Sequence, residues 1–347
     1  GGKTNNDPAW GESHTSAWYD TNFLLSDMKD YRQRISDCTF RFASESAIVG
    51  APPLHSLRKF LSEDDIFGPD KALWEYRTKD NPYNGIDAMT HYDMLVKTAE
   101  QLYGRTEDPI LRLRHMEYVQ CEWIRLAMEA ARRRMFFSSG LLFWMYNDCW
   151  PASGWSMLDY FGFAKAGWYG MKRACAPVIA ALAPVDNHVE LWIASDLAKD
   201  ASIPYRLLIQ PFSASAQILA EGTMGIKGNS SQKVTDIPCE KLGRDCLLVC
   251  DIESPSGTDR AIYYPGPLHD AILPRTQLQV FQSSRGSRGQ VRITAENYAR
   301  VVTLEGDLDF SDNYIDLLPG ESREITWTCP TGEFDGPVNV ICWNQLE

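Results

Sequence analysis

The chain has 347 residues, 44% of them hydrophobic, which is enough for one large domain or two to three smaller ones, each with its own core. Its 34 basic and 46 acidic residues give a formal net charge of -12, which would repel a phosphate backbone and argues against nucleic acid as a partner. No apolar stretch reaches the roughly 18 to 20 residues needed to cross a bilayer, and the first residues lack the pattern of a signal peptide, so we expect no membrane partner and a cytoplasmic location.

Near the start, the stretch WGESHTSAWY at 10–19 is the first candidate binding loop. His14 alone would say little, but Trp18 and two further aromatic residues lie within the same ten positions. Aromatic faces stack on the C–H surface of sugars, so His14 and Trp18 become candidate ligand-binding residues.

The stretch CTFRFASES at 38–46 predicts a buried strand that ends on one carboxylate, Glu45. From spacing alone, Glu45 could pair with an arginine such as Arg41, or cap the following loop. In a parallel sheet, however, functional groups gather at the C-terminal ends of strands. Glu45 is therefore also a candidate catalytic residue.

Residues 108–135 show apolar side chains at helical spacing, with Asp108 as a plausible cap and Pro109 in the first helical position. We expect a long amphipathic helix. The three arginines at 132–134 lie near its negative C-terminal end, and we interpret them as a solvated helix end and not as a binding patch.

An apolar run at 141–146 predicts a strand buried on both faces, and 164–176 predicts a helix that ends before Pro177. Strand, helix, strand, helix is the order of a parallel sheet, either doubly wound or a barrel. Polar and aromatic side chains suited to a sugar follow the second strand; they are Trp144, Asn147, Asp148 and Trp150. Aromatic residues at strand ends are more often core, and that alternative stays open.

After residue 184 the helical periodicity gives way to short alternating runs separated by Gly, Pro, Ser and Asp, which predicts two small β-sandwiches. On one such run, Val189, Leu191 and Ile193 should face the core, and on the next run Ile203, Tyr205, Leu207 and Ile209 should do the same. The cluster of Pro265, Gly266 and Pro267 indicates the break between the sandwiches. We therefore predict three domains, at 1–183, 184–266 and 267–347.

Motifs for other chemistries are absent: the sequence has no GxSxG, HExxH, P-loop or GxGxxG pattern, and no histidines at metal-ligand spacing. We expect no cofactor and no metal. The nine cysteines are an odd number without a CxxC pair, which favours reduced thiols. Hydrolysis by carboxylates is the chemistry that remains.

Two segments carry a family resemblance. RFASESAIVGAPPLHSL at 41–57 and GLLFWMYNDCWPASGWSMLDYFGFAKAGWYGMKRACAPV at 140–178 resemble the end of the catalytic (β/α)8 barrel of glycoside hydrolase family 2, in its β-mannosidase branch. FSDNYIDLLPGESREI at 310–325 is similar to the last immunoglobulin-like domain of these enzymes. The resemblance implies a multidomain α/β plus all-β chain: the C-terminal part of a (β/α)8 TIM barrel at 1–183, followed by two immunoglobulin-like β-sandwiches.

The resemblance also implies an activity. The family hydrolyses terminal β-linked sugars with retention of configuration, and Glu45 occupies the position of its nucleophile. A retaining mechanism needs a second carboxyl group about 5 to 5.5 Å away as acid/base. In the family that group is a Glu after an Asn, upstream of the nucleophile. This sequence contains no Asn-Glu pair. Glu12 lies in a segment that resembles the family's stretch downstream of the acid/base, so it is not the expected acid/base. We expect the chain alone to be inactive, and the remainder of the enzyme or a homo-oligomer contact to cover its open barrel.

The substrate is less sharply specified. S-E-S-A at 44–47 departs from the S-E-Y-G of mannosidases and resembles the E-T-S-A of exo-β-glucosaminidases, whereas the segment at 147–162 is closer to mannosidases. We favour a terminal β-mannoside, with glucosaminide, galactoside and glucuronide as alternatives. Two non-catalytic interpretations remain: the sandwiches could bind glycan, or they could only brace the barrel. Their tryptophans Trp192, Trp327 and Trp343 fall in strand patterns that favour a core role.

Overall fold

The structure is a computed structural model, and it describes residues 31–37, 40–46, 48–78, 90–334 and 336–346. His14 and Trp18 lie outside these residues. The chain divides into two compact units, each assembled from separate stretches. The first unit comprises residues 1–48, 122–144 and 170–271, and the second comprises 49–121, 145–169 and 272–347. The domain boundaries expected from the sequence stay a prediction.

Helices occupy mainly the first half of the chain. The described helices are α3 (Tyr31–Asp37), α4 (Leu54–Leu57), α5 (Glu63–Phe67), α6 (Ala72–Arg77), α7 (His91–Tyr103), α8 (Pro109–Arg133), α9 (Ala166–Ala174) and α10 (Trp343–Leu346), with short 3-10 turns η2 (Cys239–Lys241) and η3 (Leu268–Asp270). None of the helices in the described part of the chain is long and apolar enough to cross a membrane.

Helix α8 begins where the sequence predicts. Oδ1 of Asp108 accepts hydrogen bonds from the backbone N–H groups of Ile110 (2.8 Å) and Leu111 (2.9 Å), and Pro109 occupies the first helical position. These bonds satisfy two of the amide groups that have no partner inside a helix. The expected cap is therefore confirmed.

The other end of α8 differs from the prediction. Arg132 and Arg133 are only 7% and 9% exposed, so the interpretation as a solvated helix end is wrong. Arg132 Nη1 donates to the carbonyls of Ala174 (2.8 Å) and Ala176 (2.5 Å), and Arg133 donates to Ser36 Oγ at 2.8 Å. The Ala174 and Ala176 carbonyls lie at the end of α9, where a helix leaves acceptors unpaired, and the guanidinium satisfies them.

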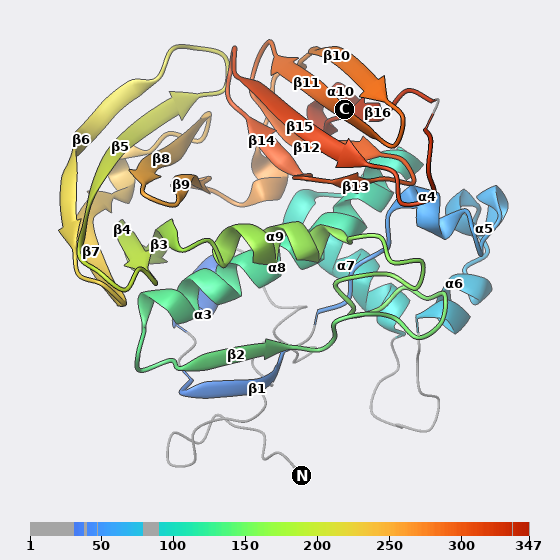
Figure 1. Ribbon diagram of the computed structural model, residues 1–347, viewed down its shortest axis with the longest axis horizontal. Coiled ribbons are helices and arrows are strands. Elements are labelled where there is room, and N and C mark those ends of the chain that lie inside the picture. Colours follow the sequence, from blue (N-terminus) through green and yellow to red (C-terminus); the bar gives the residue numbers. More distant parts are fainter. Residues whose placement is uncertain (1–30, 38–39, 47, 79–89, 335, 347) are drawn as a thin grey trace. The chain divides into compact units, whose positions relative to one another are not determined.

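Two parallel strands, β1 (Phe42–Ser46) and β2 (Gly140–Phe143), lie side by side in the first unit (Figure 1). The expected parallel pairing is thus present. The expected burial of the 141–146 run is wrong: Leu142 is 52% exposed and Trp144 50% exposed. A strand becomes buried on both faces only where further strands and helices cover it, and among the described residues β1 and β2 form a two-stranded sheet.

A first β-sandwich follows in the same unit. Its three-stranded sheet has the order β3-β4-β7 and its four-stranded sheet the order β6-β5-β8-β9. The strands are β3 (Val178–Val185), β4 (His188–Ser195), β5 (Ala201–Pro211), β6 (Gln217–Ile226), β7 (Ser230–Pro238), β8 (Cys246–Ser254) and β9 (Gly257–Tyr263). Both sheets contribute buried side chains to one hydrophobic core, as in a sandwich. Strand β3 begins at Val178, before the boundary that composition indicated at 184.

Alternation is confirmed on β4 and only partly on β5. Val189, Leu191 and Ile193 are all fully buried, as expected. On β5, Ile203 and Leu207 are buried, and so is Leu208, next to the point where β6 has one extra residue, Leu219, in its pairing with β5 (Figure 1 shows the two strands side by side). An extra residue in one strand disturbs the pairing locally, and a regular alternating pattern does not predict it.

The second unit contains the second sandwich. Its sheets have the orders β10-β11-β15-β13 and β14-β12-β16. The strands are β10 (Leu278–Arg285), β11 (Arg288–Ala295), β12 (Ala299–Glu305), β13 (Asp309–Phe310), β14 (Ile315–Leu317), β15 (Ser322–Thr328) and β16 (Asn339–Ile341). Inward residues of three strands, Val291, Val302 and Ile325, are at most 1% exposed. The two β-sandwiches predicted to follow the helical half of the chain are therefore present.

Candidate functional site

The ends of β1 and β2 form the first half of the candidate site. The strands pair in parallel with Phe42 opposite Gly140 and Ser46 opposite Phe143. The backbone N–H of Trp144 then donates to the carbonyl of Ser46 at 2.8 Å. The C-terminal ends of the two strands therefore meet at one edge, which is where the parallel order predicts functional groups.

Glu45 lies on an irregularity of β1. Ala43 pairs with Leu141 and Ser46 pairs with Phe143, so β1 has one more residue than β2 between these two pairs. The extra residue falls at Ser44–Glu45. Such bulges are common beside active sites, because they change the direction in which one side chain points. The structure describes the backbone of Glu45 but not its side chain.

The alternative partner of Glu45, Arg41, has another neighbour. Its guanidinium lies 4.8 Å from the ring centroid of Phe137, a favourable cation–π geometry. The pairing of Glu45 with Arg41 stays a prediction. Trp144, directly after β2, is half exposed and is a predicted sugar-binding aromatic residue among the described residues of this unit.

The remaining predicted residues, Asn147, Asp148 and Trp150, belong to the second unit. Asn147 is exposed, and its Nδ2 donates to the carbonyl of Asp148 at 3.1 Å. An exposed amide of this kind can exchange hydrogen bonds with sugar hydroxyls. Its role in binding stays a prediction.

Asp148 is 2% exposed, and its Oδ2 accepts from Ser156 Oγ at 2.5 Å. Its backbone N–H donates to the carbonyl of Leu158 at 3.2 Å. These contacts tie residue 148 to the segment at 156–158. The contacts present are those of a residue that shapes the loop carrying Asn147.

Trp150 packs edge-on against Tyr76, with ring centroids 5.6 Å apart. The guanidinium of Arg77 lies 5.0 Å from the Trp150 ring, and its Nη1 donates to the Pro151 carbonyl at 3.2 Å. Tyr76 is 64% exposed, so this end of α6 and Trp150 together present an aromatic and cationic surface. Such a surface suits the C–H face and hydroxyls of a sugar.

Sequence reasoning missed a buried ionic cluster in the second unit. Arg114 Nη1 lies 2.8 Å from both carboxylate oxygens of Glu117 and 2.5 Å from Glu305 Oε1. Tyr314 Oη donates to Glu117 Oε2 at 3.1 Å, and His55 Nδ1 lies 3.2 Å from Glu305 Oε2. The spacing of Arg114 and Glu117 at i and i+3 is visible in the sequence, but nothing there connects them with Glu305.

The two carboxyl groups of the cluster have opposite pKa shifts. Burial, opposed by the Arg114 charge and reinforced by Glu305, raises the pKa of Glu117 to about 7. Burial also acts on Glu305, but the Arg114 charge and the His55 hydrogen bond outweigh it and lower the pKa of Glu305 to about 2. The cluster joins α4 and α8 to strand β12.

The tryptophans that could have formed a binding face on the sandwiches are mostly core. Trp327 is 4% exposed and Trp343 is 2% exposed. Trp192 is partly buried, and its Nε1 donates to Glu190 Oε2 at 2.7 Å. The expected core role of Trp327 and Trp343 is confirmed, but the strand expected around Trp343 is wrong, because Trp343 begins helix α10 (Trp343–Leu346).

Comparison with known proteins agrees with these observations. Residues 273–340 match the Ig-fold domain of the Ig_mannosidase family model. β-Mannosidase B of Aspergillus flavus is 24% identical over 359 residues, covering 94% of this chain and 40% of the relative. Exo-β-D-glucosaminidase of Hypocrea virens is 25% identical over 366 residues, covering 89% of this chain and 39% of the relative. The chain thus spans about 40% of the length of the relatives it matches.

Solved structures share the fold. A β-D-mannosidase from Dictyoglomus thermophilum matches with a TM-score of 0.79 and 19% identity, covering 96% of this chain and 40% of that one. An exo-chitosanase from Amycolatopsis orientalis matches with a TM-score of 0.67 and 16% identity, covering 87% of this chain and 42% of that one. The resemblance read from the sequence is confirmed: the chain is similar, over nearly its whole length, to β-mannosidases of glycoside hydrolase family 2.

Proposed function

We propose that the chain carries the nucleophile of a retaining, exo-acting glycoside hydrolase that removes terminal β-linked sugars, with β-mannosides as the preferred class. The meeting of the β1 and β2 ends carries the proposal, because it places the Glu45 bulge beside the half-exposed Trp144. Similarity to β-mannosidase B over 94% of the chain supports it.

In the proposed reaction, the Glu45 carboxylate attacks the anomeric carbon as the bond from that carbon to the leaving oxygen breaks. The product is a glycosyl ester on Glu45, and water then attacks the anomeric carbon and releases the sugar. A second carboxyl group protonates the leaving oxygen and afterwards takes the proton from water. Trp144, Asn147 and Trp150, with His14 and Trp18, are proposed to contact the sugar. Asp148 is proposed to hold the loop that carries Asn147.

The second carboxyl group has no candidate in the sequence by the family pattern, which requires a Glu after an Asn. We propose that it comes from outside these 347 residues and that residues 1–183 form only part of a (β/α)8 barrel. The chain alone should not turn over p-nitrophenyl β-mannoside. Turnover that Glu45→Gln abolishes would contradict this part of the proposal.

The two sandwiches are proposed to brace the barrel part and not to bind glycan. The buried contact of Arg114 with Glu305 joins helix α8 to the matched immunoglobulin-fold domain, within one compact unit. A mobile binding module would meet its neighbour through a solvated interface. The Arg114–Glu305 ion pair is buried, which favours a fixed, bracing contact.

A trapping reagent tests the role of Glu45 without the missing acid. In 5-fluoro-β-mannosyl fluoride, fluoride leaves without protonation, and the ring fluorine slows hydrolysis of the ester. We expect mass spectrometry to find one added fluoromannosyl group on the peptide that contains Glu45. Glu45→Gln should remain unlabelled, whereas the matched control Glu63→Gln, which changes an exposed carboxylate on α5, should be labelled like the unmodified chain. Labelling of another carboxylate would overturn the assignment.

A glucosaminide-specific enzyme is the second candidate, favoured by the S-E-S-A sequence at 44–47 and by the similarity to exo-β-D-glucosaminidase. The same trapping experiment with the manno, glucosamine, galacto and glucurono reagents ranks the four sugars by the rate of labelling. We expect the manno reagent to react fastest. A faster glucosamine reagent would select the second candidate.

A further inference from the structure

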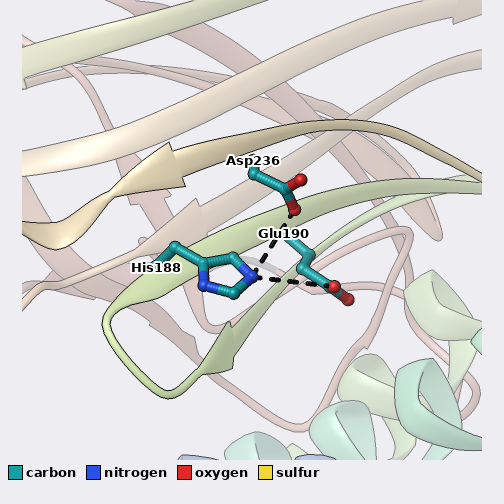
Figure 2. A group of neighbouring side chains, drawn as sticks. All are labelled: His188, Glu190 and Asp236. Carbon is teal, nitrogen blue, oxygen red and sulfur yellow. Dashed lines mark ion pairs between the residues drawn. The ribbon is translucent and has the colours of Figure 1, made fainter.

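Three potential metal ligands meet on the first sandwich, away from the residues assigned to catalysis. His188 and Glu190 lie on β4, and Asp236 lies on the neighbouring strand β7 (Figure 2). Glu190 and Asp236 are directly opposite each other in the antiparallel pair. Because side chains alternate along a strand, His188 is on the same face as Glu190. Two paired strands therefore present all three side chains together.

The distances are close to those of a coordination site. His188 Nε2 lies 3.8 Å from Glu190 Oε1 and 3.6 Å from Asp236 Oδ1, and one ligand atom from each residue lies within 4.8 Å of the others. In a tetrahedral zinc site with bonds of about 2.1 Å, ligand atoms lie about 3.4 Å apart. Small side-chain rotations would close the difference.

A neighbouring tryptophan orients one ligand. The indole N–H of Trp192 donates to Glu190 Oε2 at 2.7 Å, which leaves Oε1 on the side of His188 and Asp236. Hydrogen bonds of this kind, from a residue outside the coordination shell, hold carboxylate ligands in position. Trp192 is two residues after Glu190 on β4, so the same strand supplies both groups.

A cation already lies at this position. Lys233 Nζ is 3.2 Å from Glu190 Oε1 and 3.0 Å from Asp236 Oδ1. One ammonium leaves the pair of carboxylates with a net negative charge, which a divalent ion would neutralise. The Lys233 side chain is 40% exposed, and its flexible stem can carry the ammonium into solvent.

We propose that His188, Glu190 and Asp236 bind a divalent transition-metal ion, with Zn²⁺ as the representative ion, in exchange for the Lys233 ammonium. One imidazole nitrogen and two carboxylates suit Zn²⁺, Co²⁺ or Ni²⁺ better than Ca²⁺ or Mg²⁺, which prefer oxygen ligands. Three protein ligands leave one position for water or for a group from another molecule. Competition with Lys233 makes binding depend on that residue.

Calorimetric titration of the full chain with Zn²⁺ tests the site. Exposed thiols also bind zinc, so Cys149→Ser and Cys175→Ser are introduced in every variant. We expect one Zn²⁺ ion per chain, at least tenfold weaker binding in His188→Ala, and about tenfold tighter binding in Lys233→Met, since the two ion pairs of Lys233 no longer compete. Co²⁺ should show the visible absorption of a nitrogen- and oxygen-bound ion, lost in His188→Ala.

His269→Ala is the matched control. His269 also lies beside an aspartate, Asp270, at 3.3 Å, but it belongs to no group of three potential ligands among the described residues. The variant should bind Zn²⁺ like the parent. Zinc binding that His188→Ala leaves unchanged, or an absence of binding in both Lys233→Met and Lys233→Gln, would overturn the proposal. Circular dichroism of each variant verifies that the sandwich is folded.

Discussion

Arg114 on helix α8 and Glu305 at the end of strand β12 form a buried ion pair of 2.5 Å, although 191 residues separate them in the sequence. Their side chains are 1% and 9% exposed. The same Arg114 nitrogen also contacts both oxygens of Glu117. One guanidinium therefore holds two carboxylates together inside the second unit, and the helical segment and the immunoglobulin-like domain share this contact.

Removing Arg114 should strongly destabilise the second unit. In Arg114→Met, Glu117 and Glu305 remain buried without their cation, and breaking a buried pair in this way costs about 3–5 kcal/mol. Urea unfolding followed by circular dichroism measures the loss. The control is Arg58→Met, which removes an exposed pair with Glu63 and should cost less than about 1 kcal/mol. Equal small losses in both variants would contradict a stabilising role for the cluster.

The stability of the second unit should depend on pH through Glu117. Its pKa is about 7 in the folded chain and near 4.5 when exposed, so the folded state holds the proton between these values. Stability from this group is therefore present below pH 4.5 and is lost as the pH rises towards 7, by roughly 3 kcal/mol at most. Glu305 acts in the opposite direction: its contribution is present above pH 4.5 and is lost as the pH falls towards 2.

The variant Glu117→Gln isolates the first effect. Gln at this position cannot titrate. The unfolding free energy of the unmodified chain should therefore fall relative to that of the variant as the pH rises from about 5 to about 8. Parallel pH profiles for the two proteins would show that Glu117 titrates normally in the folded state. Glu63→Gln, at an exposed position, should leave the profile unchanged over this range.

The sequence predicted those features that depend on local spacing. Asp108 and Pro109 predicted the start of α8, and alternation predicted the buried face of β4, because caps and side-chain periodicity are set within a few residues. The burial of Arg132 and Arg133 was not predicted, since their carbonyl and hydroxyl partners lie elsewhere in the chain. The extra residue in β6 was also missed, because it appears only when the register of β6 against β5 is known.

The candidate site was likewise predicted only where local spacing determines it. The order of strands and helices predicted that the ends of β1 and β2 would meet, and the Trp144 to Ser46 hydrogen bond confirms it. Composition could not tell which of the residues 147–150 would be exposed. Asn147 is exposed, whereas Asp148 is buried and accepts a hydrogen bond from Ser156, eight residues further along the chain. Whether a loop residue is buried depends on which later segment of the chain packs against it.

Asp148 should therefore act mainly through the shape of its loop. In Asp148→Ala, the Ser156 hydroxyl loses its acceptor, and we expect the second unit to lose about 1–3 kcal/mol. Ser156→Ala should cause a similar loss, and the double variant should lose less than the sum, because both changes remove the same hydrogen bond. Cys149→Ser, at an exposed neighbour, should be neutral. Additive losses would show that the two side chains act separately.

Trp144 should contribute to sugar binding without supporting the fold. Half of its side chain is exposed, so Trp144→Ala removes an aromatic face and little core, and the urea midpoint should hardly change. Loss of stacking worth about 0.5–1.5 kcal/mol should slow labelling by 5-fluoro-β-mannosyl fluoride roughly two- to tenfold, through weaker binding of the reagent. Phe281→Ala, which removes an aromatic side chain that is 67% exposed on β10, is the matched control and should be labelled at the original rate. If Trp144→Ala keeps the original rate, Trp144 does not form the sugar platform.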